Sequence, residues 1–251
     1  ESPRVRWGDL HGHSQLTDGT GTPDAFYVYA REVAMLDFCA LTDHDHWGLR
    51  FLDQHEEIWE HLQEVTNAHN QPDDFVTIVG YEWTSWIHGH RHVLSFSDSA
   101  TMLSSLSEET DDPAELWAAL RGTESMTLAH HSAGGPIATN WEFPPDPVLE
   151  PLTEVMSVHD SSEAMDSPSL IYSPLPGNFV RDILDEGYVL GFIASGDSHD
   201  GPPGLPHLDP YYEYRFETDT RPAQVGTGGV AAVFTEELTR AALLTALRAR
   251  A

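Results

Sequence analysis

The sequence contains no lysine and only one cysteine among its 251 residues. Its 12 basic residues are therefore all arginine, and they stand against 41 acidic residues, which gives a net charge of −29. A surface this acidic repels the phosphates of nucleic acid and of anionic membranes, so we expect neither as a partner. Because salt screens self-repulsion between carboxylates, we interpret this acidic protein as halophilic and expect salt to stabilise it.

The single cysteine, Cys39, cannot form an internal disulfide, and it lies in the apolar segment 36–41. We therefore expect a buried, unreactive thiol. No apolar stretch is long enough for a membrane span, and no signal-peptide pattern follows Glu1. These features favour a cytoplasmic protein, with export and removal of a signal as the alternative.

Short apolar runs alternate with helical patterns along the chain. Strands separated by helices predict βαβ units and a parallel sheet. About seven such strands favour an α/β barrel that forms one domain over residues 1–251. Segments 97–112, 134–151 and 201–228 are rich in Pro, Gly, Ser and Asp, and we expect them to form long loops over one end of the barrel. Helices are expected at 23–36, capped by Thr22, at 47–69, 113–121 and 179–186, and at 235–251, capped by Thr235; strands are expected at 5–10, 38–42, 75–79, 92–96, 125–129, 152–158, 189–194 and 229–234.

Histidines and carboxylates recur just after the ends of the predicted strands. The carboxyl ends of barrel strands meet on one rim, so residues far apart in sequence converge there. Burying so many imidazoles and carboxylates together would be costly unless cations satisfied them, and this ligand set suits zinc, manganese or iron. The sequence thus predicts two or three divalent ions held by residues within 9–13, 42–46, 130–131 and 196–199, together with Glu82, His92 and His159.

The motifs resemble those of the polymerase-and-histidinol-phosphatase (PHP) superfamily of metallohydrolases. They are DLHGHS at 9–14 with Asp18 downstream, LTDHD at 41–45, GYE at 80–82, AHH at 129–131 and GDSH at 196–199, in the family's order over nearly the whole chain. Segments 80–91 and 229–248 are also similar to an uncharacterised branch of large PHP-like proteins. A related branch contains esterases and carbamate hydrolases.

The resemblance implies a distorted (β/α)7 barrel of the PHP type with up to three metal ions on its rim. His90 rivals His92 as a ligand, His131 rivals His130, and Asp43 would orient a neighbouring ligand. The implied sets are His11, His13, Glu82 and Asp197 for the first ion, Asp18, His44 and His130 for the second, and Glu82, His92 and His199 for the third, with Glu82 bridging.

In the expected mechanism, ions on the rim activate a bridging water as the nucleophile. Asp197 belongs to the catalytic set as a ligand, and His159 would protonate the leaving group. The alternative for His159 is a hydrogen bond within the rim. His90, Arg91 and His131 are candidates for binding the substrate, with Arg91 clamping an anion or, alternatively, pairing with one of the many acids.

Three functions compete. The first is a phosphoesterase acting on a small phosphate ester. The second is a carboxylester, carbamate or lactone hydrolase with the same ions, in which Trp47, Trp83, Trp86 and Trp141 would line an apolar pocket. The third is a non-catalytic, metal-bound scaffold.

Overall fold

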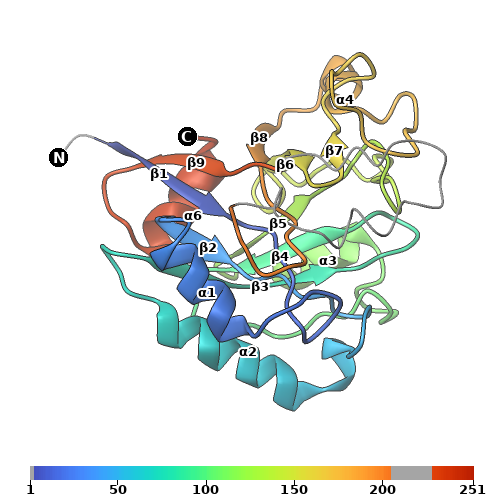
Figure 1. The fold of residues 1–251 in the computed structure, drawn as a ribbon. Coiled ribbons are helices and arrows are strands. Elements are labelled where there is room, and N and C mark those ends of the chain that lie inside the picture. The colour runs from blue at the N-terminus through green and yellow to red at the C-terminus, as the bar shows by residue number, and fades with distance from the viewer. Residues whose placement is uncertain (1–2, 205–227) are drawn as a thin grey trace.

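The computed structural model describes residues 3–204 and 228–251, so most of the loop expected at 201–228 lies outside the described residues. The described strands belong to one curled sheet (Figure 1). They are β1 (Arg4–Asp9), β2 (Phe38–Ala40), β3 (Val76–Trp83), β4 (Arg91–Ser95), β5 (Ser125–Ala129), β6 (Leu152–Ser157), β7 (Asp160–Ser161), β8 (Gly191–Ala194) and β9 (Ala231–Thr235).

The strand order is β7-β6-β5-β4-β3-β2-β1-β9, and β8 also pairs with β6. Near the two ends of the curl, the backbone N–H of Gly229 donates to the carbonyl of Ser195 at 2.9 Å, so the segments that adjoin β8 and β9 meet. The protein therefore has a mixed α/β fold with a barrel-like sheet. A regular count of seven βα units is not what the sheet shows.

The prediction of a parallel sheet is wrong for two of the predicted strands, and the short β7, which was not predicted, also runs antiparallel to β6. β4 runs antiparallel to β3 and to β5, and β9 runs antiparallel to β1. A parallel neighbour needs a crossover connection, usually a helix, whereas only residues 84–90 join β3 to β4 and they contain no helix. The short connection therefore turns the chain back beside the strand it has just left.

Two helices begin well after the expected residue, and the first helix ends at Glu32 instead of residue 36. The helix predicted from Trp47 starts only at Glu56, because Gly48 has a left-handed φ of +88° and a Cβ there would meet the backbone of Thr17 at 2.5 Å. The last helix starts at Arg240 with Thr239 as its N-cap, since Thr235 belongs to β9. The helices are α1 (Pro23–Glu32), the 3₁₀ turn η1 (Leu52–Gln54), α2 (Glu56–His69), α3 (Pro113–Leu120), α4 (Val180–Asp185) and α6 (Arg240–Ala249).

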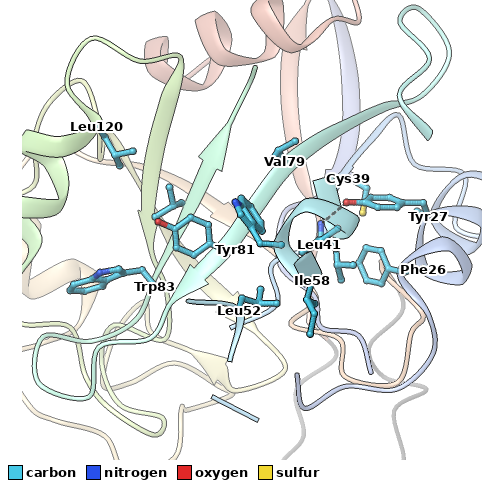
Figure 2. Close-up of a cluster of buried hydrophobic side chains, with 14 of the residues drawn as sticks. Phe26, Tyr27, Cys39, Leu41, Leu52, Ile58, Val79, Tyr81, Trp83 and Leu120 are labelled. Carbon is cyan, nitrogen blue, oxygen red and sulfur yellow. Dashed lines mark hydrogen bonds between the residues drawn. The ribbon is translucent and has the colours of Figure 1, made fainter. Parts of the chain in front are cut away.

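Helices α1 and α2 pack against each other on the outer face of the sheet (Figure 1). The Thr22 cap of α1 is confirmed, since its hydroxyl accepts a hydrogen bond from the backbone N–H of Ala25 at 3.1 Å. Phe26 and Tyr27 of α1 pack into a hydrophobic core between these helices and the sheet, and Cys39 is fully buried in this core, as expected (Figure 2). Burying a side chain of the size of Phe26 stabilises the fold by roughly 1.5–3 kcal/mol.

Alternation along β3 separates two cores. Val79, Tyr81 and Trp83 point outward into the core under α1, α2 and α3 (Figure 2). Val76 and Ile78 point inward and join a second core, to which residues of most other strands and of α6 contribute. Because neighbouring side chains of a strand face opposite sides, residue parity decides which side chains reach the interior of the barrel.

Candidate metal centre

Along several strands, the side chains that face the interior of the barrel are apolar at first and become polar toward one end of the barrel. Glu82 follows Val76 and Ile78 at even spacing on β3, and it pairs in register with His92 of β4. His130 lies two residues beyond Leu128 of the interior core. All these polar side chains are buried. Strand alternation therefore directs several ligand-type groups to a shared point above the apolar interior.

Two motif loops join them because the segments beyond β1 and β8 continue to pair. Gly12 and Ser198 form a parallel bridge, in which the N–H of His13 donates to the carbonyl of Ser198 at 2.8 Å and the N–H of Asp197 donates to that of His11 at 2.9 Å. Asp197 has a left-handed φ of 55°, a strained conformation for a residue other than glycine. These bonds lay the HGH and DSH motifs side by side.

Ligand atoms of His11, His13 and Asp197 converge in a first group, and both imidazoles also face Glu82. Nε2 of His11 lies 3.1 Å from Oδ1 of Asp197 and 3.4 Å from Oε2 of Glu82. Nε2 of His13 lies 3.3 Å from the same Asp197 oxygen, 3.4 Å from the same Glu82 oxygen and 3.3 Å from Nε2 of His11. Ligands held tetrahedrally at about 2.0–2.1 Å from zinc are separated by about 3.4 Å, so this group has the dimensions of a metal site.

A second group surrounds Asp18. Its carboxylate lies 3.4 Å from Nε2 of His44, 3.5 Å from Nε2 of His199 and 3.8 Å from Nδ1 of His13. The ligand atoms of these four residues all lie within 4.8 Å of one another. The group is next to the first one, since His13 belongs to both.

A third region is made almost entirely of imidazoles. Glu82 and His130 combine either with His11 and His92 or with His90 and His131, and in each case the ligand atoms lie within 4.8 Å of one another. The rings of His92 and His130 stack at 4.3 Å. Both ring nitrogens of each make no hydrogen bond within the described part of the chain. Buried polar atoms without partners are costly, and divalent cations would satisfy them.

Glu82 connects the three groups. Its Oε1 lies 2.7 Å from Nδ1 of His90, 3.3 Å from Nδ1 of His44 and 3.4 Å from Nε2 of His130. Its other oxygen faces His11 and His13 in the first group. One carboxylate thus offers each oxygen to a different set of imidazoles, as a bridging ligand does.

The surroundings shift the pKa of the buried acids and bases in opposite directions. Burial alone would raise the pKa of Glu82, but His44 and His130 beside it hold that pKa well below its usual value. Burial opposes protonation of His44 too, yet Glu82 and Asp18 raise its pKa well above normal. Burial keeps the pKa of His92 well below normal, so this imidazole stays neutral and offers a lone pair.

The structure groups these ligands differently from the sets implied by the resemblance. Of the first set, His11, His13 and Asp197 form one group, and Glu82 faces both of its imidazoles. In the other two sets His130 and His199 exchange places: His199 joins Asp18 and His44, whereas His130 joins Glu82 and His92. Both rival histidines, His90 and His131, also face Glu82 and His130.

Two buried carboxylates, Asp43 and Glu154, lie behind the ligands. Asp43 accepts hydrogen bonds from the hydroxyls of Ser14 and Thr17, so it lies behind the ligands, as expected. Glu154, which sequence analysis missed, has Oε2 3.1 Å from Nδ1 of His11 and leaves Nε2 of that ring facing the first group. The sequence did contain a signal for Glu154. It follows the inward-facing Leu152 by two residues, so both side chains face the interior of the barrel.

A cavity of about 60 Å³ opens above the first and second groups. His159 lines it, and Nε2 of this ring lies 2.8 Å from Oδ2 of Asp197. Trp47, Trp86 and Tyr172 also line it. The other expected pocket aromatics lie elsewhere, since the indole N–H groups of Trp83 and Trp141 donate to the carbonyls of Thr110 and Asn178.

Arg91 faces away from the cavity. It has the outward parity of Trp83, with which it pairs in register. Its Nε donates to Oε2 of buried Glu150 at 2.9 Å, and its guanidinium lies 5.9 Å from the centre of the Trp117 ring. Of the two roles considered for Arg91, the ion pair is the one found in this geometry.

The comparisons with known proteins agree with this architecture. A family model described as a protein of unknown function (DUF3604) matches residues 43–135. An uncharacterised protein of Chlamydia pneumoniae is 24% identical over 99% of this chain, which spans only 39% of that protein's length. None of the described helices is long and apolar enough to cross a membrane.

Among solved structures, a two-domain Bacteroides vulgatus protein, described as containing a predicted PHP-like metal-dependent phosphoesterase, is similar with a TM-score of 0.60 and 19% identity. The match covers 99% of this chain and 64% of that one. PsfC from Pseudomonas syringae is less similar, with a TM-score of 0.48, 16% identity and coverage of 98% and 97% of the two chains. The similarity to the Bacteroides vulgatus protein shows that the two chains share a fold, as the sequence motifs led us to expect.

Proposed function

We propose that this chain is a metal-dependent hydrolase, and specifically a phosphoesterase that cleaves a small phosphate ester with two or three divalent ions. The observation that carries the proposal is that His11 and His13 lie 3.1–3.4 Å from the carboxylates of both Asp197 and Glu82. Zinc, manganese or iron would suit this mixture of imidazole and carboxylate ligands. The proposal treats residues 1–251 as the hydrolase domain of a protein that is active without nucleic acid.

Ions held by these groups would lower the pKa of water and neutralise charge that develops on the attacked ester. Glu82 would hold two ions at a fixed spacing, because its two oxygens face different imidazoles. Glu154 and Asp43 would keep the surrounding side chains in place. His159 lines the cavity beside Asp197 and would supply the proton that the leaving group requires.

A carboxylester, carbamate or lactone hydrolase remains the second candidate because the cavity lining favours it in one respect. Among the described residues around the cavity there is no arginine, whereas Trp47 and Trp86 are present. Phosphate sites commonly recruit basic side chains, although metal ions can take their place. The clustered imidazoles and carboxylates support the phosphoester reaction. The aromatic rings concern the identity of the organic group attached to the ester.

The test measures hydrolysis of several classes of ester by protein whose metal content is known. The protein is stripped with a chelator, reloaded separately with manganese, zinc or iron, and assayed on chromogenic phosphate monoesters, phosphate diesters and carboxylate esters. We expect metal-dependent hydrolysis of a phosphate ester. Hydrolysis of carboxylate esters alone would select the second candidate, and bound ions without any turnover would indicate the non-catalytic scaffold.

A further inference from the structure

We propose that Trp47 and Trp86 form a subsite for an uncharged aromatic group of the ester. This inference rests on the proposed phosphoesterase function and specifies the substrate class as aryl phosphates. The subsite would hold the part of the substrate that lies beside the candidate metal centre, where indole rings line the mouth of the cavity.

The two indoles form a partly exposed pair. Their ring centroids are 5.0 Å apart, with planes inclined at 58°, and the side chains are 39% and 43% exposed. Trp86 also lies edge-on to His90, with 5.3 Å between ring centroids. Large aromatic rings left in contact with water at a cavity mouth are typical of recognition sites, where a planar partner covers them.

A second hollow extends this surface away from the ions. It has a volume of about 430 Å³ and is lined by Trp47, Leu49 and Phe51, together with Asp18 and residues near it. Trp47 and Asp18 also line the cavity above the candidate metal centre, so the two spaces adjoin. An ester whose phosphate faces the ions can therefore extend its leaving group over the indoles toward the hollow.

Charge distinguishes the kind of group that fits. Among the described residues that line either space there is no arginine, the histidines all belong to the cavity above the ligand groups, and Asp18 belongs to both linings. A leaving group with its own phosphate or carboxylate would extend away from the ions into the second hollow, where no arginine is available to pair with it. An uncharged aromatic ring needs no such partner and would stack on Trp47 or Trp86.

Binding of two phosphonates to the manganese-loaded protein tests the subsite without relying on turnover. Phenylphosphonate and methylphosphonate carry the same anionic head, and calorimetry compares their dissociation constants. We expect phenylphosphonate to bind about tenfold more tightly, as a well-placed aromatic contact gives. The ratio should fall to near one in Trp47→Ala or Trp86→Ala and should largely survive in Trp47→Phe.

Trp7→Ala is the matched control. Trp7 is a comparably exposed tryptophan (49%) on β1 that lines neither space, so its removal should leave the ratio unchanged. Equal affinities for the two phosphonates in the wild-type protein would overturn the aromatic subsite and leave the proposed function standing. If neither phosphonate binds to the ion-loaded protein, the phosphoester proposal and the subsite both fail.

Discussion

The candidate metal centre has two halves, which differ in how the charge of their side chains is balanced. In the acidic half the imidazoles lie against carboxylates, and in the imidazole half they lie mainly against one another. The acidic half consists of His11, His13, Asp18, His44, Asp197 and His199, the imidazole half consists of His90, His92, His130 and His131, and Glu82 lies between them.

Protonation can stabilise only one of these halves in the absence of ions. The pKa of His13 is raised to about 9 although burial and His44 oppose it, because Asp197, Glu82 and Asp18 lie close by. In the imidazole half, burial first, and His90 and His159 next, keep the pKa of His131 well below normal. In the metal-free protein His13 therefore favours its protonated form, whereas His131 favours its neutral form and offers a lone pair to a cation.

The largest expected effect comes from Glu82→Gln, which removes the charge that joins the halves. The amide keeps the shape of the side chain but cannot bridge two cations as a carboxylate does. We expect loss of bound metal and a fall in kcat/KM of about a thousandfold, equivalent to several kcal/mol of transition-state stabilisation. Metal counting by mass spectrometry and ester hydrolysis are the measurements.

Glu57→Gln provides the control, since Glu57 of α2 is an exposed glutamate away from the candidate metal centre. If Glu82→Gln retains all ions and full activity, the bridging role is contradicted, and with it the division of the candidate metal centre into two halves joined by one carboxylate.

His90→Ala and His92→Ala test the imidazole half. Each of these rings faces Glu82 and His130 within one of the alternative groups. We expect the variant that lacks the true ligand to release one ion per chain, because alanine offers no lone pair to a cation. Metal counting on the two variants distinguishes the rivals. Unchanged metal content in both would show that this half holds no ion.

His159→Ala should separate catalysis from metal binding. His159 reaches the candidate metal centre through Oδ2 of Asp197, while Oδ1 of that residue faces His11 and His13. We expect a full metal complement with kcat lowered by about a hundredfold, as for a lost general acid. If kcat is unchanged for an ester with a poor leaving group, His159 only hydrogen-bonds within the rim.

Glu154→Gln tests the support of the acidic half. The carboxylate of Glu154 lies 3.1 Å from Nδ1 of His11 and fixes which nitrogen faces the ion site. Loss of such an orienting carboxylate lowers metal affinity by about 10- to 100-fold. Competition with a chromophoric chelator measures this change. Glu163→Gln, at an exposed glutamate, serves as the reference, and equal affinities in the two variants would remove Glu154 from the site.

The smallest effect is a pH dependence that distinguishes the halves in metal-free protein. His13 has a raised folded pKa of about 9, so its stabilising contribution is complete below about pH 6.5 and is lost as pH rises through 9. His131 has a depressed folded pKa, so its contribution is present above about pH 6.5 and is lost as pH falls.

Thermal denaturation in chelator should therefore show Tm falling between pH 7 and pH 9.5, by about 2–4 °C for each kcal/mol lost. Bound ions keep the ligands deprotonated, so metal-loaded protein should lose this alkaline slope. A Tm of metal-free protein that rises toward pH 9.5 would contradict the protonated acidic half.

Several features could be predicted because they depend on neighbours in sequence. The Thr22 cap and the burial of Cys39 follow from local patterns, and both are confirmed. The HGH and DSH motifs were predicted to meet because each follows an apolar run that reads as a strand. The period of two along such a strand also contained the signal for Glu154 and for the outward position of Arg91.

Sequence alone determined which residue types form the candidate metal centre and predicted that they gather at one end of a sheet. Only tertiary structure decided that β4 runs antiparallel, that His199 joins Asp18 while His130 joins Glu82, and that Arg91 pairs with Glu150. The physical reason is that a ligand set depends on strand register and on loop pairing between distant segments, such as the Gly12–Ser198 bridge. Local side-chain preferences carry no information on these long-range pairings.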